Sequence, residues 1–291
     1  MATAKQTFAG MTEERIDGPD GLKLFVRTWH PVGKARGVVA IVPGFNSHSG
    51  YYSWVGRQLA AAGLAAYAVD LHGRGKSDGE RFYVNSFFDY VGDLHALVGS
   101  IRDWEPQSPL VLLGHGAGAV VSCLYALEYQ VWLAGLICES LAFQLPAPQL
   151  ALAMLKAISH AIPHAHVLRL RNRDFSRDPA VLRLMDGDPL IANEAQTTKS
   201  LAELVRANAR LKKEFPFIAL PLLILHGTGD RAAQPGGSRF FYDSAGSVDK
   251  ELKLYEGHYH DLLNDIDKDT VMEDIKRWIN ARLSLDPQIV E

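Results

Sequence analysis

The sequence lacks the features that define several large classes of protein. It has only two cysteines in 291 residues, Cys123 and Cys138, and neither a disulfide framework nor a zinc-ligand spacing is visible. It has no run of about 18 apolar residues, the length of a membrane span, and its first 21 residues lack the apolar segment of a signal peptide. Both cysteines lie in apolar segments, which predicts buried thiols in a reducing compartment, so we expect a cytoplasmic protein.

The sequence also lacks an excess of positive charge and the common nucleotide-binding patterns. Thirty Lys and Arg stand against 33 Asp and Glu, so nothing indicates a nucleic-acid partner. The glycine-rich stretch HGRGKSDG, residues 72–79, does not have the spacing of a phosphate-binding P-loop. No G-x-G-x-x-G pattern follows the first strand, which argues against a dinucleotide-binding oxidoreductase. We therefore expect neither a metal nor an organic cofactor.

The pattern that is present is an alternation of strand and helix signals. Short, apolar, β-branched runs are typical of strands covered on both faces, and stretches of helical periodicity separate them. The expected strands are 21–29, 37–44, 64–70, 109–114, 133–140, 220–227 and 251–257, and the expected helices include 51–63, 86–104, 117–129 and a closing helix. This alternation predicts an α/β fold with a mostly parallel sheet and helices on both faces.

A long segment in the second half of the chain breaks this rhythm. Residues 141–214 have helical periodicity, several prolines and no strong strand. We predict a helical cap at 141–214, inserted into a core formed by 1–140 and 215–291.

The first part of the predicted cap is unusually apolar. The segment APQLALAMLKAISHAIPH, residues 147–164, is apolar around nearly its whole circumference, which suits either a core helix or the lining of an apolar channel. In the second case Leu152, Leu155 and Ile158 are the candidate substrate-binding residues. Further along, HVLRLRNRDFSR, residues 166–177, carries four arginines. They form either a solvated face or a basic rim for an anionic group.

The stretch LVLLGHGAGAV, residues 110–120, raises the question of catalysis. It runs from a buried strand through a glycine-rich turn into a helix of small residues. In many hydrolases this turn is G-x-S-x-G, and its serine is the nucleophile. Here the glycines are Gly114 and Gly118, but the middle position is Gly116, which has no side chain.

The other parts of such a site have candidates elsewhere. A serine-type site also needs a histidine base, an acid that orients it, and backbone N–H donors for the oxyanion. Asp230 ends the run LLILHGTGD, and His260 lies in LYEGHYHDLL just past the next strand. Their separation of 30 residues fits one intervening helix. The oxyanion donors would be the N–H groups of Phe45 and Ala117.

Five motifs, in order, carry a resemblance that covers residues 15–284. They are VPGFNSHSGYY, DLHGRGKSDG, GHGAG, LHGTGD and YEGHYHDLLND. Together they resemble α/β-hydrolases of the monoacylglycerol lipase and lysophospholipase type. The resemblance implies hydrolysis of carboxylic esters with lipid-like or apolar acyl groups. It assigns Asp230 as the acid, His260 as the base and position 116 as the nucleophile position. The expected partner is a small ester, and transient contact with a lipid surface is left open.

Gly116 departs from the family pattern, and three hypotheses follow. The chain is a serine esterase whose nucleophile was removed by design, or a protein that naturally lacks the serine and binds a ligand without turnover. In the third hypothesis His260 activates water or abstracts a proton directly, without a covalent intermediate. Loss of a catalytic serine typically lowers kcat by about 10⁶-fold, so we expect little ordinary serine-esterase turnover. Ser122 offers no replacement, because it lies six residues further along the helix.

Overall fold

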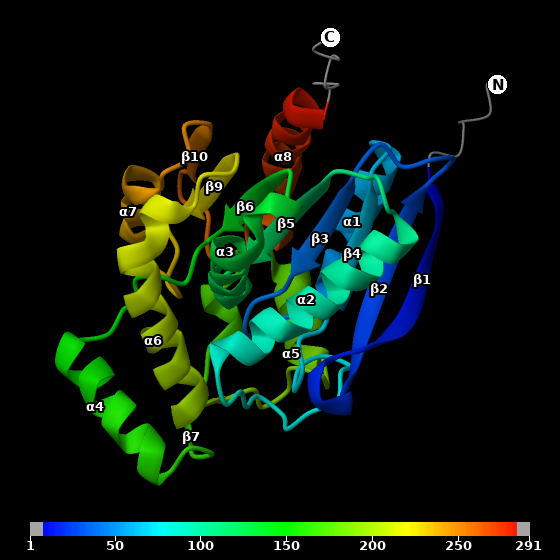
Figure 1. The fold of residues 1–291 in the computed structure, drawn as a ribbon. Helices are drawn as coiled ribbons and strands as arrows, with labels where there is room; N and C mark the ends of the chain where they lie inside the picture. Colours follow the sequence, from blue (N-terminus) through cyan, green and yellow to red (C-terminus); the bar gives the residue numbers. More distant parts are fainter. Residues whose placement is uncertain (1–7, 284–291) are drawn as a thin grey trace.

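The central feature of the fold is one eight-stranded sheet, whose strands lie side by side across Figure 1. The computed structural model describes residues 8–283, so the outer ends of the predicted core, residues 1–7 and 284–291, lie outside the described range. The strand order is β1-β2-β4-β3-β5-β6-β9-β10. Strand β2 pairs antiparallel with both β1 and β4, and the other pairs are parallel. The predicted α/β class is confirmed.

The strands of this sheet match the apolar runs of the sequence, with one addition. Their bounds are β1 Phe8–Asp17, β2 Lys23–Pro31, β3 Val38–Val42, β4 Ala65–Val69, β5 Leu110–His115, β6 Gly135–Glu139, β9 Leu222–Gly227 and β10 Lys250–Tyr255. Sequence reasoning missed β1, an edge strand paired only with β2. Most of its side chains are exposed, so it lacks the apolar pattern that marks a half-buried strand.

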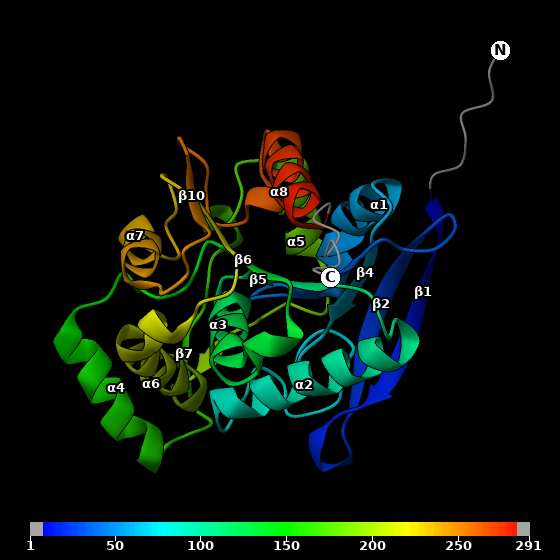
Figure 2. The same cartoon turned by 45° about the horizontal axis from the view of Figure 1, so that its top comes forward.

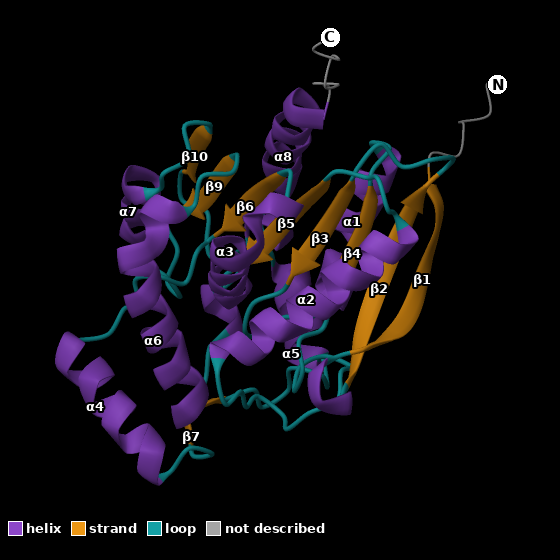
Figure 3. Cartoon of the chain, viewed as in Figure 1, coloured by secondary structure: helices purple, strands orange, loops and turns teal. Residues whose placement is uncertain are grey.

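Helices cover both faces of the sheet, as Figures 2 and 3 show. Their bounds are α1 Ser53–Ala61, α2 Phe87–Trp104, α3 Ala117–Tyr129, α4 Gln149–Ala161, α5 Pro179–Gly187, α6 Thr198–Glu214, α7 Pro235–Ser244 and α8 Lys268–Leu283. Helices α1 and α8 share one apolar cluster with the sheet, and α2, α3, α6 and α7 contribute to the cluster on the other face. Helix α2 begins at a capping box of Ser86 and Asp89.

The segment between β6 and β9 contains three α-helices, two single-turn 3-10 helices and two very short strands. Strands β7, His166–Leu168, and β8, Gln196–Thr197, pair antiparallel in a small separate sheet that the sequence analysis did not expect. Helix α6 packs on α3 and α4, and α4 lies at the outer corner of the molecule (Figure 1).

Within residues 8–283, no helix combines the length and the apolar character that crossing a membrane requires. Cys123 and Cys138 are both buried, as predicted, and their Sγ atoms lie 3.6 Å apart.

Candidate active site

The turn between β5 and α3 has a backbone conformation that favours glycine. Gly116 has φ 56° and ψ −116°, in the left-handed range that side chains with a Cβ rarely adopt. Its N–H donates to the carbonyl of Glu139 at 2.9 Å, and its carbonyl accepts from the N–H of Ala142 at 3.2 Å. Two residues on, a Cβ at Gly118 would lie 2.1 Å from the carbonyl oxygen of Val42. The turn is therefore held from both sides, and its close approach to β3 requires a glycine at position 118.

Asp230 and His260 meet as the sequence order suggested. His260 Nδ1 and Asp230 Oδ2 lie 2.7 Å apart, and both side chains are buried. The second carboxylate oxygen, Oδ1, accepts the N–H groups of Ala232 and Ala233 at 2.7 and 2.9 Å. These contacts fix the carboxylate just past the end of β9, and the carboxylate in turn orients the imidazole. We assign the ring proton to Nδ1 from this contact, which leaves Nε2 as the free acceptor.

The imidazole of His260 faces the space above Gly116. A Cβ built on Gly116 would lie 2.9 Å from His260 Nε2 and 3.6 Å from its Cε1. A separation below 3.0 Å requires a small shift, and here the neighbour is the end of a side chain. The structure therefore brings together position 116, His260 and Asp230, and Nε2 faces the place where a nucleophilic side chain would begin.

The charged forms of Asp230 and His260 stabilise each other. Burial acts to lower the pKa of His260, but the charge of Asp230 and its hydrogen bond outweigh burial and raise that pKa above its usual value. Burial acts to raise the pKa of Asp230, while the charge of His260 and hydrogen bonds from His226 and His260 bring it below its usual value. Both directions describe an aspartate that stays ionised and stabilises a protonated imidazole, as a general base requires.

The two predicted oxyanion donors, Phe45 and Ala117, line the same cavity as His260. Ala117 is the first residue of α3, so its N–H has no acceptor within the helix, and Gly116 before it has no side chain that could cap it. A Cβ at Gly44 would lie 3.4 Å from the nitrogen of Ala117, so the loop that carries Phe45 runs against the elbow. This arrangement allows both amides to serve one carbonyl oxygen.

Sequence reasoning missed the buried group that holds the Phe45 loop. Glu194 Oε1 accepts the N–H of Asn46 at 2.9 Å and pairs with Arg74 Nη1 at 2.5 Å. The guanidinium of Arg74 lies 4.1 Å from the ring centroid of Phe45. The glycine-rich loop 71–80 thus supplies an arginine that connects the loop of Phe45 to the inserted segment.

A second missed support lies behind Asp230. His226 Nε2 lies 2.9 Å from Asp230 Oδ2, and its Nδ1 lies 2.7 Å from Ser238 Oγ. His226 is fully buried within β9 and belongs to the LHGTGD motif. A histidine in an otherwise apolar strand was the available signal.

A third missed group lies beneath His260. Glu139 Oε1 accepts the N–H of Leu263 at 3.0 Å, while its backbone carbonyl holds Gly116, so this residue connects the elbow to the loop that follows His260. Burial and the neighbouring charge of Asp261 raise the pKa of Glu139 well above its usual range. Burial raises the pKa of Asp261 to about 6. The visible signal was a single carboxylate at the end of an apolar strand.

Among the described residues, His115, Glu139 and Asp261 form the group whose potential metal-ligand atoms lie within 4.8 Å of one another. All three are buried, and burial lowers the pKa of His115 to about 3, with a further contribution from the charge of His260. His115 Nε2 donates to the carbonyl of His260 at 3.3 Å. Burial shifts both carboxyl groups toward their protonated forms, because it disfavours the charged state.

Two further polar residues near the motifs, Ser122 and His258, lie where no chemistry at the elbow is expected. Ser122 is buried and donates to the carbonyl of Gly118 at 2.8 Å, so its hydroxyl stays within α3. His258 does not line the cavity that contains His260.

The cavity above the elbow has a volume of about 480 Å³ and is mostly apolar, within the range of small-molecule sites. Leu152 and Leu155, two of the three candidate substrate-binding residues, line it. Ile158 is not among its lining residues, and its side chain is 42% exposed. Six residues of helix turn the chain by about 600°, so Ile158 faces about 120° away from Leu152. Here the structure corrects the predicted set.

The four arginines of 166–177 have different surroundings. Arg177 pairs with the buried Asp265 at 2.8 Å, and Arg171 pairs with Asp174 at 2.7 Å. Arg169 and Arg171 line the cavity, whereas Arg173 is exposed and does not. The four arginines therefore form neither a uniform solvated face nor a single rim.

The sheet order, the glycine elbow after β5 and the Asp–His pair after β9 and β10 define an α/β-hydrolase. Residues 33–267 match the family model described as serine aminopeptidase, S33 (Hydrolase_4), and the chain belongs to this family. It is 31% identical over 271 residues to the monoglyceride lipase of Rattus norvegicus, covering 91% of this chain and 89% of the relative. It is 28% identical over 274 residues to the monoacylglycerol lipase of Mycolicibacterium smegmatis, covering 94% and 98%.

A solved structure shows the same likeness. The crystal structure of Paleococcus ferrophilus monoacylglycerol lipase superposes with a TM-score of 0.81 at 25% identity, covering 89% of this chain and 99% of that one. The chain is therefore a hydrolase of the lipase and esterase type by family.

Proposed function

We propose that the chain binds carboxylic esters with apolar, lipid-like acyl groups above Gly116, and that this glycine prevents the covalent step of hydrolysis. The observation that supports this is the Asp230–His260 pair, whose Nε2 faces an elbow without a side chain. In serine hydrolases a hydroxyl attacks the ester carbonyl, the histidine takes its proton and two N–H groups stabilise the oxyanion. Here His260, Phe45 and Ala117 supply the last two functions, and the attacking oxygen is missing.

The segment 141–214 is proposed to act as a cap that shapes the acyl site. Leu152 and Leu155 of α4 line the cavity together with Leu201 and Leu204 of α6. Several relatives are named monoglyceride or monoacylglycerol lipases, which supports an acyl chain as the apolar part of the ligand. Leu150, Met154 and Ile158 of α4 and its C-cap residue Ile162 are exposed and recur every four positions, and a transient contact with a lipid surface would use this stripe.

A second candidate chemistry is general-base hydrolysis without an acyl-enzyme. The space above Gly116 lies next to a free acceptor nitrogen of raised pKa. A water molecule there could be deprotonated by His260 and attack the ester directly. Such turnover would depend on His260 but would leave no covalent adduct.

The test is the pair of variants Gly116→Ser and Gly116→Ala, assayed with p-nitrophenyl esters of short and medium acyl chains. We expect the first variant to gain hydrolysis by at least about 10³-fold, with a burst of nitrophenol, while the second gains nothing. The alanine variant matches the backbone strain of the serine variant but carries no hydroxyl. Equal activity of both variants would refute the proposed mechanism. Activity of the unaltered chain that His260→Ala removes, without a burst, would favour direct base catalysis.

A further inference from the structure

The cavity above the elbow is apolar but not uncharged. Three arginines line it, Arg169, Arg171 and Arg231, and one carboxylate, Asp174, lies in the same wall. Asp174 already pairs with Arg171 through a contact of 2.7 Å. Asp174 neutralises one of the three arginines, so the charges of Arg169 and Arg231 remain in the wall of an otherwise apolar pocket.

Neither of the two remaining arginines forms an ion pair within residues 8–283. Arg231 follows Asp230 directly, and its guanidinium carbon lies 4.4 Å from the ring centroid of Tyr259. The turn that holds Asp230 also fixes the backbone of Arg231, because the amides of Ala232 and Ala233 donate to the Asp230 carboxylate. The Asp230 carboxylate cannot neutralise Arg231, since it is buried and bound by His226 and His260.

Arg169 reaches the cavity from the inserted segment. It lines the cavity together with its sequence neighbours Leu168 and Leu170. Core and inserted segment thus each contribute one uncompensated guanidinium to the pocket that contains His260. Guanidinium groups bind carboxylates and phosphates through paired hydrogen bonds.

We propose that the cavity takes an anionic amphiphile, with its apolar chain among the leucines and its anionic group held by Arg169 and Arg231. This inference rests on the proposed function for the location of the acyl chain and adds the charge of the ligand. Both arginines are solvent-exposed, and an uncharged glycerol ester would offer their guanidinium groups no anionic partner. An ester or product that bears a carboxylate or a phosphate would pair with them and gain in affinity.

The experiment is calorimetric titration of the unaltered chain with three ligands of equal chain length: dodecanoate, monododecyl phosphate and uncharged dodecanol. We expect each anion to bind at least about tenfold more tightly than dodecanol, with the preference shrinking as salt rises from about 0.05 to about 0.5 M. A preference for dodecanoate alone identifies a carboxylate ligand, and a preference for the phosphate identifies a phosphate ester.

The variants Arg169→Gln and Arg231→Gln locate the effect. Each is expected to weaken anion binding by about fivefold, the scale of a partly exposed charge pair, with dodecanol binding unchanged. Arg173→Gln is the matched control, because Arg173 is exposed in the same stretch and does not line the cavity. Equal affinity for anions and dodecanol, or an equal loss in the Arg173 variant, would overturn the proposal.

The outcome also separates this proposal from the proposed function. If all three ligands bind equally and Gly116→Ser gains esterase activity, the acyl site stands and only the anion site is refuted. If none of the ligands binds and that variant gains no activity, the proposed function itself fails, and the anion site fails with it.

Discussion

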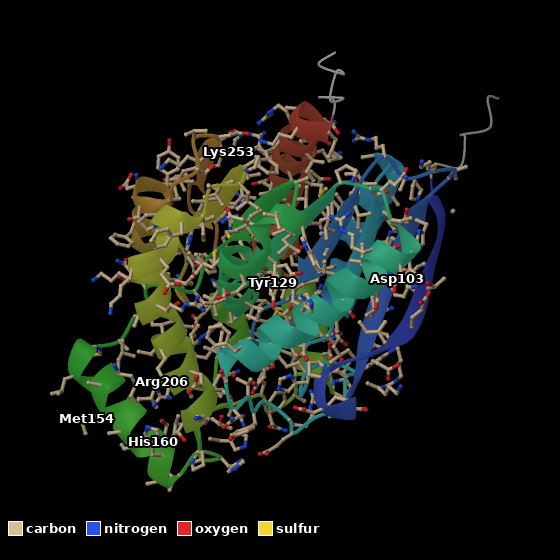
Figure 4. All side chains as sticks on the ribbon, viewed as in Figure 1. Asp103, Tyr129, Met154, His160, Arg206 and Lys253 are labelled. Atoms are coloured by element: carbon tan, nitrogen blue, oxygen red, sulfur yellow. The ribbon has the colours of Figure 1, made fainter. Side chains whose placement is uncertain are left out.

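The parallel core and the inserted segment contribute different parts of the candidate site. Strands β3, β4, β5, β6 and β9 are buried along their whole length, and the loops at their ends carry Gly116, Asp230 and the Phe45 loop. Helix α4 of the insert has no buried hydrophobic side chain and lies at the outer corner of the molecule (Figure 4, where Met154 and His160 mark it). The packed core therefore holds Asp230, His260 and the elbow in place, while α4, with no buried hydrophobic side chain, lines part of the cavity above them.

The insert is not uniformly loose, because its inner part is tied to the core. Asp188 contacts His48 Nε2 at 2.8 Å and the hydroxyl of Tyr51 at 3.0 Å, and Glu194 binds Arg74 and Asn46. Helix α4 is held mainly through α6, where Arg206 donates to the carbonyl of Lys156 at 3.2 Å. The Phe45 loop is thus held by the inner part of the insert, whereas α4 is held mainly through α6.

The largest expected difference between the core and the inserted segment is in how substitutions change esterase activity. In the Gly116→Ser background, His260→Ala should lower kcat by about 10⁶-fold, because the introduced hydroxyl loses its base. Leu155→Ala in the same background should lower kcat/KM by only about tenfold, since it removes apolar contact with the acyl chain. Steady-state kinetics on p-nitrophenyl esters measures both. Comparable losses in the two variants would mean that α4 belongs to the catalytic apparatus and not only to the pocket.

The next prediction compares how substitutions in the core and in the inserted segment change the free energy of unfolding. Leu223→Ala in β9 empties a fully buried position and should lower the free energy of unfolding by about 2–5 kcal/mol. Leu150→Ala on the exposed side of α4 should change it by no more than about 0.5 kcal/mol. Urea unfolding with matched m-values checks both. A large loss at position 150 would show that this face is covered in solution.

A smaller effect concerns the buried acid beneath the site. Because its pKa is raised in the fold, Glu139 binds a proton that the unfolded chain releases above about pH 4.5, and its contribution to stability is lost as pH rises. His115, whose pKa falls to about 3, opposes this trend below about pH 6.5, where the unfolded chain binds the extra proton.

The variant Glu139→Gln isolates the carboxyl. The difference in unfolding free energy between this variant and the parent should shift in favour of the variant by up to about 1.4 kcal/mol per pH unit as pH rises above about 4.5. Denaturant unfolding between pH 5 and pH 8 measures the difference. A difference that stays constant over this range would show that Glu139 is ionised in the fold.

The smallest effect concerns the strain of the elbow. Gly116→Ala places a Cβ at φ 56° and 2.9 Å from His260 Nε2, and should cost about 1 kcal/mol of stability. Gly187→Ala is the control, because Gly187 has no positive φ and a Cβ there meets nothing within 4 Å. If thermal unfolding shifts equally in both, the elbow is not strained.

The sequence predicted the core well because its strands are short apolar runs buried on both faces, a pattern that local composition reveals. It brought Asp230 and His260 to the right strand ends because motif order and strand rhythm fix both. Glu194, Arg74 and Glu139 escaped notice because their roles depend on partners 120 or more residues away, and no local pattern encodes such a partner. Ile158 was assigned to the pocket because a helix that is apolar all round does not show which side faces the cavity.

The most direct test of the central claim is labelling of Gly116→Ser with a fluorophosphonate, followed by intact-mass measurement. In the proposed site only the nucleophile is missing around position 116. We therefore predict one stoichiometric adduct on this variant, none on the unaltered chain or on Gly116→Ala, and none after His260→Ala in the serine background. An unlabelled Gly116→Ser protein that is correctly folded would contradict the account.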